Sequence, residues 1–288
     1  MINGWLTVSQ KIKRMRKQST LLILVLVSFL GRAQQATFNK IPFEALKVCN
    51  LESTKIVKGG ELYFNVGHRF GSVKGGVNTF FGLDQSNTKI QLIYGLADIA
   101  HIGLSRESIR KTYSGELKVA FLKQEDSRWC SLTGHTSINV NTELNKETYP
   151  KMLFFDRLSY ATQLIAAKKV SERWTIQLSP TFIRQNLVLE PFQLHNQIGL
   201  GLGTRVRVSQ RLSINAEYMM NVYRARESIY KDGLSMGLDF ETGGHVFQLL
   251  FSNAQSMNGP GFMTNAEGNW LQGDIFFGFN ISRKFKLH

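Results

Sequence analysis

The chain has 288 residues, of which 35 are basic and 21 acidic, and its formal net charge is +14. Its 43% hydrophobic and 11% aromatic content excludes a disordered chain, and its two cysteines exclude a fold held together by disulfides. No run of about 18 apolar residues is present, which excludes a helical membrane protein. None of these properties excludes a membrane protein that crosses the bilayer with β-strands.

Residues 1–33 have the order of a secretory signal peptide. The basic block Lys11–Lys17 precedes the apolar run Leu21–Leu30, and Gly31 and Ala33 are the small residues expected before a signal-peptidase cut. As a helix, the apolar run rises only about 15 Å, which is too short for a bilayer anchor. We therefore expect export and cleavage.

The chain that follows the leader is less basic than the whole. Residues 1–33 carry 6 basic and no acidic residues, which leaves a net charge of +8. Because an exported protein rarely meets nucleic acid, we predict no nucleic-acid partner. Residues 34–58 are predicted to form an irregular periplasmic segment. Met15 would give a more compact leader than Met1, so both starts remain open.

From residue 59 onward, apolar and polar residues alternate with the period of a β-strand. Near the C-terminus, Ile275, Phe277, Phe279 and Ile281 share one face, and small or polar residues share the other. Successive strand side chains point to opposite faces, so such a segment has one apolar and one polar side. The pattern predicts twelve strands, near residues 60–70, 87–94, 100–107, 113–122, 129–141, 156–169, 173–184, 197–208, 212–222, 233–240, 245–252 and 272–286.

The connections between these strands alternate in length. Short joints fall at 95–99, 123–128, 170–172, 209–211 and 241–244. Longer ones fall at 71–86, 142–155, 185–196, 223–232 and 253–271, and in this second set only 108–112 is not clearly long. Short turns at one end, long loops at the other and an even strand number are typical of outer-membrane barrels. We predict an all-β fold over residues 59–288, a closed antiparallel transmembrane β-barrel of about 12 strands with short periplasmic turns and longer extracellular loops.

A soluble β-sandwich from an exported chain is the alternative, because its strands also alternate. The regular alternation of joint lengths argues against it. Aromatic residues near the predicted strand ends also favour a membrane barrel, which has an interfacial aromatic girdle. These residues are Trp129, Phe154, Phe155, Tyr160, Trp174 and Trp270.

Four segments resemble one family: HRFG at 68–71, FGLD at 81–84, ETGGHVFQL at 241–249 and WLQGDIFFGFNISR at 270–283. It is an uncharacterised outer-membrane β-barrel family of Bacteroidota-type bacteria, a domain-of-unknown-function β-barrel. The resemblance extends over about residues 60–286, whereas residues 36–58, with Cys49, depart from the pattern. It implies an outer-membrane location and supplies no catalytic residues.

The candidate site consists of polar residues at the alternate strand positions whose side chains are predicted to point into the barrel lumen. Buried charges must pair or meet water, so these side chains form either an internal ion-pair network or a charged channel wall. The predicted lumen-lining residues are Glu116, Lys118, His135, Arg205, Arg207, Glu217, Asp239 and Asp274. A twelve-strand barrel is wide enough for water, less so if Phe80, Phe81 and the rest of loop 71–86 fold inward.

No motif indicates other chemistry. The six histidines show no metal-ligand spacing, so no metal is predicted. The glycines between Gly199 and Gly203 lack the spacing of a nucleotide loop, so no cofactor is predicted. No nucleophile motif is present, so no catalytic residue is predicted and the protein is not expected to be an enzyme. The alternative is a barrel lipid hydrolase with a serine and a histidine at the rim, a pair that no motif in this sequence identifies. Cys49 and Cys130 could pair in an oxidising compartment or remain as two partly buried thiols.

The three-residue joint at 209–211 makes its two flanking strands direct neighbours. Pairing about a centre near residue 210 places Arg205 opposite residue 215 and Arg207 opposite residue 213, with Glu217 diagonal to Arg205. We therefore predict an Arg205–Glu217 contact at the lumen, with Arg207 left for solvent or Asp239.

Two functions remain open from the sequence. The first is a pore or binding barrel in the bacterial outer membrane for a small polar or amphipathic solute. The second is a non-conducting anchor barrel that partners another cell-envelope component. Outer-membrane lipid is the expected partner of either one.

Overall fold

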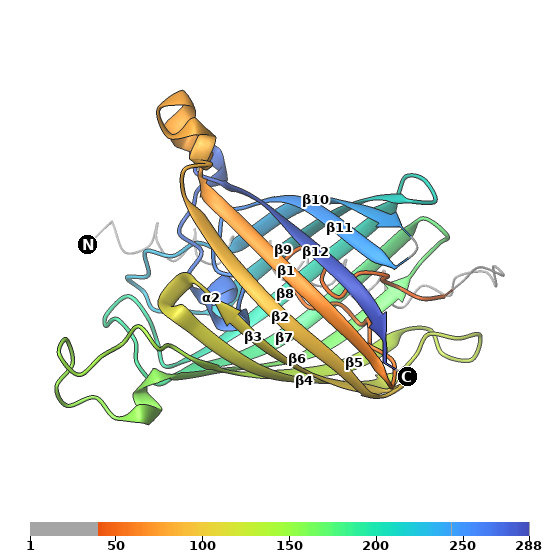
Figure 1. The fold of residues 1–288 in the computed structure, drawn as a ribbon, viewed down its shortest axis with the longest axis horizontal. Helices are drawn as coiled ribbons and strands as arrows, with labels where there is room; N and C mark the ends of the chain where they lie inside the picture. The colour runs from red at the N-terminus through yellow and green to blue at the C-terminus, as the bar shows by residue number, and fades with distance from the viewer. Residues whose placement is uncertain (1–39, 243, 288) are drawn as a thin grey trace, which may run out of the picture. The chain divides into compact units, whose positions relative to one another are not determined.

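The computed structural model describes residues 40–242 and 244–287, and the predicted signal peptide lies outside these ranges. Twelve antiparallel strands follow one another around a closed barrel, in which β1 pairs with β12 (Figure 1). The strands are β1 Glu61–Ser72, β2 Ser86–Ala97, β3 Ala100–Glu107, β4 Thr112–Leu122, β5 Ser131–Val140, β6 Leu158–Lys169, β7 Trp174–Gln185, β8 Asn196–Arg207, β9 Leu212–Tyr223, β10 Gly233–Thr242, β11 His245–Ser252 and β12 Phe276–Lys286. The prediction of a twelve-stranded closed barrel is confirmed.

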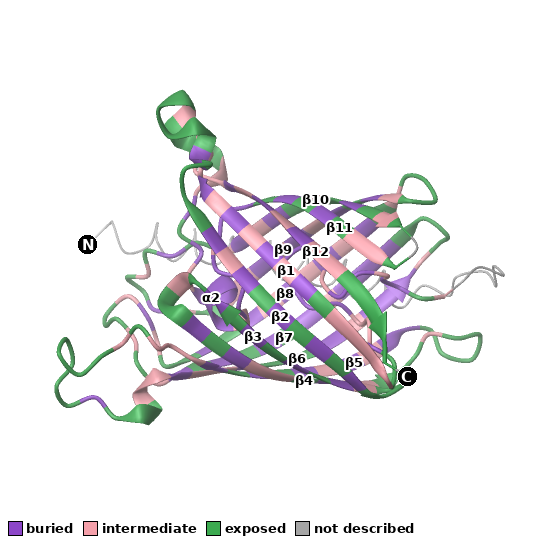
Figure 2. Cartoon of the chain, in the orientation of Figure 1, coloured by how far each residue is buried: buried purple, intermediate pink, exposed green. Residues whose placement is uncertain are grey.

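Burial alternates along the strands because successive side chains point into and out of the barrel (Figure 2). In β2, Asn87, Lys89 and Gln91 are buried, whereas Ile90 and Leu92, whose side chains point to the opposite face, are exposed. The barrel therefore has a polar inner face and an apolar outer face, the reverse of a soluble β-sandwich. Trp129 and Trp174, both expected in an aromatic girdle, are exposed beside strand ends.

The two ends of the barrel differ, as the joint lengths predict. Both β1 and β12 reach the end with the short turns, such as the two residues between β2 and β3. The opposite end carries the long loops, including 141–157 between β5 and β6 and 253–275 between β11 and β12. No helix among the described residues is long and apolar enough to cross a membrane.

The long loops contain the few helical turns of the described chain. Single turns of 3-10 helix lie at Ile109–Lys111, Phe154–Arg157 and Trp270–Gln272, and α2 spans Gly259–Thr264. A longer 3-10 segment, Val73–Gly82, projects beyond the end of β1 (Figure 1). Its Phe80 and Phe81 are 61% and 53% exposed. This segment of loop 71–86, which would narrow the lumen if it folded inward, therefore points away from it.

The apolar core lies inside the barrel, where it is built mainly from segments outside the strands. Phe43, Val48 and Leu51 precede the barrel, and Phe262 and Met263 belong to α2, yet all five side chains are at most 2% exposed. They pack as one cluster with Ala161, Ala167, Ile183 and Met219 of the wall. Two segments from opposite ends of the chain therefore meet within the barrel.

Candidate functional site

Seven of the eight predicted lumen residues lie on inward positions of strands, and the exception is Asp274. Glu116, Lys118, His135, Arg205, Glu217 and Asp239 are buried or nearly so, and Arg207 is half-buried. Asp274 precedes β12, which begins at Phe276 rather than near 272. It accepts a hydrogen bond from Ser72 Oγ at the long-loop end and is not part of the strand wall.

Residues 40–58, predicted to form a periplasmic lead-in, instead enter the lumen; we call them the N-terminal plug. Val48 and Val57 are fully buried, and the plug turns back tightly where Val48 N donates to Leu51 O at 2.8 Å. The plug's apolar side chains need partners, and α2 supplies them inside the barrel. Its backbone polar groups also need partners, which the polar wall supplies.

Glu217 binds the turn of the N-terminal plug. Its Oε2 accepts hydrogen bonds from the backbone N–H groups of Cys49 (3.0 Å) and Leu51 (2.9 Å), and its Oε1 accepts one from Asn50 (2.7 Å). Successive backbone N–H groups at a tight turn form a concavity that suits an anion. The wall thus supplies the carboxylate, and the plug supplies the anion site.

Other wall side chains satisfy the carbonyl groups of the same turn. Gln248 donates to Val48 O at 3.0 Å, and Asn280 donates to Cys49 O at 2.9 Å. Arg69 donates to the Asn50 side-chain oxygen at 2.7 Å. These contacts come from β1, β11 and β12, so the plug is held by several strands at once.

Glu52 of the plug joins a buried ion-pair cluster. It pairs with Lys118 of β4 at 2.7 Å and with Lys47 of the plug. Burial alone would raise the pKa of Glu52, but Lys118 and Lys47 outweigh it and hold this pKa well below its usual range. The carboxylate is therefore charged at neutral pH and fixes the plug to the wall.

The cluster also brings three metal-type ligands close together. Glu52, Glu116 and His135 each place one donor atom within 4.8 Å of the others, and His135 Nε2 lies 3.8 Å from Glu116. However, both lysine partners of Glu52 already supply positive charge at this point. The arrangement is therefore an ion-pair network between plug and wall.

The second occupant of the lumen is the loop at 253–269, which enters from the long-loop end; we call it the loop plug. Glu107 of β3, 1% exposed, accepts hydrogen bonds from the backbone N–H groups of Met257 (2.7 Å) and Asn258 (3.0 Å). It also accepts one from the Asn258 side chain at 2.7 Å. Asn258 then caps α2 by accepting from Gly261 N. Glu107 therefore binds backbone N–H groups of the loop plug, as Glu217 binds those of the N-terminal plug.

Little space remains where the two plugs meet. A cavity of about 10 Å³ lies between Glu52 of the N-terminal plug, Phe262 and Met263 of the loop plug, and Glu116 and His135 of the wall. That is about the space for one water molecule. Among the described residues, both plugs and the wall pack against one another at the centre of the lumen.

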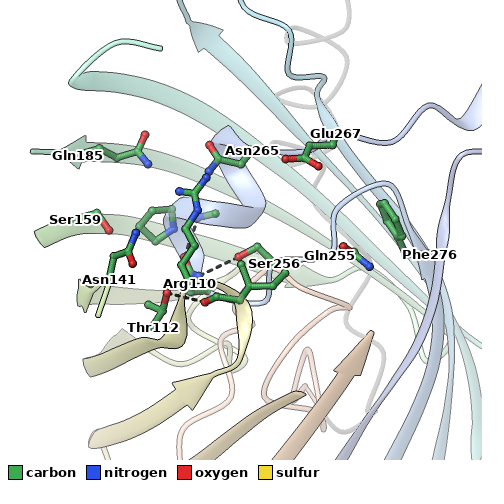
Figure 3. A pocket seen from close by; sticks show the side chains of 14 residues that line it. Arg110, Thr112, Asn141, Ser159, Gln185, Gln255, Ser256, Asn265, Glu267 and Phe276 are labelled. Atoms are coloured by element: carbon green, nitrogen blue, oxygen red, sulfur yellow. Dashed lines mark hydrogen bonds between the residues drawn. The ribbon is translucent and has the colours of Figure 1, made fainter. Parts of the chain in front are cut away.

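A vestibule lies above the loop plug at the long-loop end. Its inner chamber, about 270 Å³, has the loop plug as its floor (Figure 3). An outer chamber of about 580 Å³ adjoins it, since both are lined by Arg110, Asn141, Ser159 and Gln185. The outer walls come from the loops that follow β5 and β7.

Arg110 reaches over the inner chamber from an unusual turn. Arg110 and Lys111 have φ values of 53° and 45°, a left-handed conformation that costs energy in residues other than glycine. The Arg110 guanidinium points toward Asn265 at the end of α2 (Figure 3). Both of its terminal nitrogens lie 3.1 Å from one atom of the Asn265 side-chain amide. The amide orientation that satisfies both groups places its oxygen there, where it accepts hydrogen bonds from both nitrogens.

The predicted pairing of β8 with β9 is confirmed, but the predicted ion pair is wrong. Arg205 lies opposite Asn215, and Arg207 lies opposite Ser213. Arg205 pairs with Glu241 of β10 instead of with Glu217. The physical reason is competition, because three plug N–H groups occupy the Glu217 carboxylate. Asp239 accepts a hydrogen bond from Gln248 at 2.9 Å.

Several functional positions are missing from the sequence prediction. Glu107 and Glu52 carry the plug contacts, and Arg110 lies over the vestibule. Glu107 has inward parity on a predicted strand, so the same alternation that marks Glu116 could have identified it. Glu52 lies in the irregular plug, and Arg110 lies in a loop, where no periodicity exists to place them. Cys49 and Cys130 are both free and buried, and burial raises the pKa of the Cys49 thiol well above its usual range.

A closed antiparallel barrel with an apolar outer face and a polar, plugged interior defines a membrane-bound β-barrel protein. The model of the family described as "Membrane bound beta barrel domain (DUF5777)" matches residues 43–285, and the chain belongs to this family. The match includes most of the N-terminal plug together with the barrel, so the expectation that residues 36–58 depart from the family pattern is wrong for residues 43–58. No curated protein matches the chain.

Solved membrane barrels resemble the chain at low identity. The NanC porin is 9% identical over 78% of this chain and 100% of its own, with a TM-score of 0.46. The outer membrane protein Omp33 of Acinetobacter baumannii is 11% identical over 79% and 100%, with a TM-score of 0.43. Outer membrane phospholipase A of Escherichia coli is 11% identical over 79% and 93%, with a TM-score of 0.42.

Proposed function

We propose that this protein is an outer-membrane barrel that binds a small polar solute in its outer vestibule and is closed to steady ion flow at rest. Passage through the lumen then requires both plugs to move. The observation that carries the proposal is the packing of both plugs against the wall at the centre of the lumen, around a cavity of about 10 Å³. The export signal at residues 1–33 and the family resemblance support an outer-membrane location in a Bacteroidota-type bacterium.

The way each plug is held supports a movable closure. Each plug is held by a buried carboxylate of the wall, Glu217 or Glu107, together with further hydrogen bonds. The N-terminal plug is also held by the Glu52–Lys118 ion pair. No disulfide joins either plug to the wall, since Cys49 and Cys130 are both free. Contacts of this kind can be exchanged for water when a segment leaves, because each one contributes only a modest net stability.

Conductance in planar bilayers tests the proposal. We expect the native protein to show no steady current, and the Glu107→Gln, Glu217→Gln double variant to show discrete current steps. Glu241→Gln is the matched control, because Glu241 also forms a largely buried contact inside the barrel, but its partner is Arg205 of the wall and not a plug residue. Steady ohmic conductance of the native protein would overturn the proposal.

A second candidate function is favoured by the projecting segment Val73–Gly82. Val77, Phe80 and Phe81 are all more than half exposed on this segment, which extends beyond the barrel (Figure 1). Exposed apolar groups of this kind mark contact sites. They fit a barrel that anchors another envelope protein through its loops. Loss of a cross-linked envelope complex in Phe80→Ser, Phe81→Ser cells, with unchanged solute binding, would favour this function.

We propose that neither role is enzymatic, because the sequence carries no nucleophile motif. Solute or partner binding accounts for the vestibule and loops without a reaction.

A further inference from the structure

The inner chamber of the vestibule has the composition of a site for one chemical class of solute. Eight of its fourteen lining residues are neutral amides or hydroxyls: Thr112, Asn141, Ser159, Gln185, Gln255, Ser256, Asn258 and Asn265. Amides and hydroxyls each donate and accept hydrogen bonds. A ligand that itself donates and accepts at many positions, as a polyhydroxylated molecule does, makes use of both capacities.

The charges that line the vestibule are balanced. In the inner chamber Arg110 is opposed by Glu267, and in the outer chamber Arg110 and Arg157 are opposed by Glu143 and Asp156. A ligand with a net charge would therefore face as many like charges as opposite ones, so its desolvation would not be offset. An uncharged ligand does not meet this penalty.

Aromatic and apolar groups complete the lining. Phe276 borders the inner chamber, and Tyr149 and Tyr230 border the outer one. Such rings offer flat apolar faces beside polar groups. Small-molecule sites in proteins usually measure about 300–1,000 Å³. The inner chamber, about 270 Å³, is at the lower limit of this range, and the outer one, about 580 Å³, lies within it.

We propose that the vestibule binds an uncharged, hydroxyl-rich solute of the size of a mono- or disaccharide, with its hydroxyl groups in the inner chamber. This inference rests on the proposed function and names its solute class. Ser159 and Gln185 reach the inner chamber from the wall, and Asn141 reaches it from the start of the loop after β5 (Figure 3). Arg110 approaches it from the turn after β3, and Asn265 approaches it from the loop plug. A bound solute therefore contacts both the wall and the loop plug.

Saturation-transfer NMR on the full chain, purified in a detergent without a sugar headgroup, tests the proposal. The probes are maltose and galactose as neutral sugars, galacturonic acid as an acidic sugar and glucosamine as a basic one. We expect saturable binding of at least one neutral probe, at least about tenfold tighter than binding of either charged probe.

Two variants place the binding in the chamber. Ser159→Phe fills the inner chamber and should weaken binding of the neutral probe at least tenfold. Thr162→Phe, three residues along the same strand on its exposed outer face, is the matched control and should leave binding unchanged. Heat-modifiable gel migration checks that both barrels fold.

The outcomes separate the two proposals. Tighter binding of a charged probe that is lost in Ser159→Phe overturns the neutral solute class and leaves solute binding in the vestibule intact. Binding of a neutral probe that Ser159→Phe does not affect overturns the chamber as the site. Failure of all four probes to bind overturns both this inference and the proposed solute binding.

Discussion

Replacing Glu217 by glutamine removes the negative charge from the site that binds the N-terminal plug. The carboxylate accepts three backbone N–H groups at 2.7–3.0 Å, two through Oε2 and one through Oε1. A glutamine keeps the shape but has only one oxygen, so its amide nitrogen would face at least one of the three N–H donors. The plug itself and the rest of the barrel remain unaltered.

The structure sets the size of the effect. A hydrogen bond to a charged group contributes about 1.5–3 kcal/mol, and a buried donor left without an acceptor costs about 1–3 kcal/mol. Because the plug can relax, we expect the docked state to lose about 2–4 kcal/mol. That corresponds to an increase of about 30- to 1,000-fold in the undocked population.

Cys49 reports this population directly. Its side chain is 1% exposed beside the Glu217 contact, so a maleimide reagent reaches it only when the plug leaves. In a Cys130→Ser background, Glu217→Gln should label about 30- to 1,000-fold faster than the parent. Glu241→Gln, which breaks a wall ion pair, should label at the parental rate. Equal labelling rates in Glu217→Gln and its parent would refute the role assigned to Glu217.

Glu107→Gln should loosen the loop plug, so that chymotrypsin cleaves at the otherwise buried Phe262 at least about tenfold faster than in the native protein; equal cleavage would contradict the role of Glu107. Because the pKa of Glu52 is lowered in the docked state, its contribution is present above about pH 4.3, the usual value for a free Glu, and is lost as the pH falls below it. In the Cys130→Ser background, Cys49 labelling with a pH-tolerant reagent should therefore accelerate below about pH 4, and Glu52→Gln should reduce that acceleration. Arg205→Met leaves Glu241 without its partner and should lower the free energy of unfolding by about 2–4 kcal/mol. The temperature at which half of the protein shows heat-modified gel migration should fall accordingly, whereas Arg207→Met should change this temperature little.

The barrel could be predicted because its physics is periodic. A strand with a lipid face and a lumen face must alternate, and the alternation at residues 275–281 and in eleven other segments identifies every strand to within a few residues. The short joint at 209–211 even sets the register, and Arg205 lies opposite Asn215 as expected.

The contents of the barrel could not be predicted in the same way. Residues 40–58 have no period, and the sequence does not show that a polar wall will accept the backbone of this segment. The parity that points Glu217 inward is correct, but its partner is a main-chain turn 166 to 168 residues away. Charge pairing between neighbouring strands predicts Arg205 as the partner of Glu217. In the structure, the partners of Glu217 are instead three backbone N–H groups that only the folded plug brings together.

Disulfide trapping tests most directly whether the N-terminal plug lies inside the barrel. A β-carbon placed on Gly203 of β8 would lie 3.2 Å from Cγ2 of Val48, within reach of a disulfide. In a Cys49→Ser, Cys130→Ser background, Val48→Cys with Gly203→Cys should cross-link within one chain when the protein is oxidised in its membrane. Val48→Cys with Gly115→Cys, where no plug residue borders the glycine, should not cross-link. Absence of the Val48–Gly203 cross-link in a folded barrel would contradict the central claim that the plug closes the lumen.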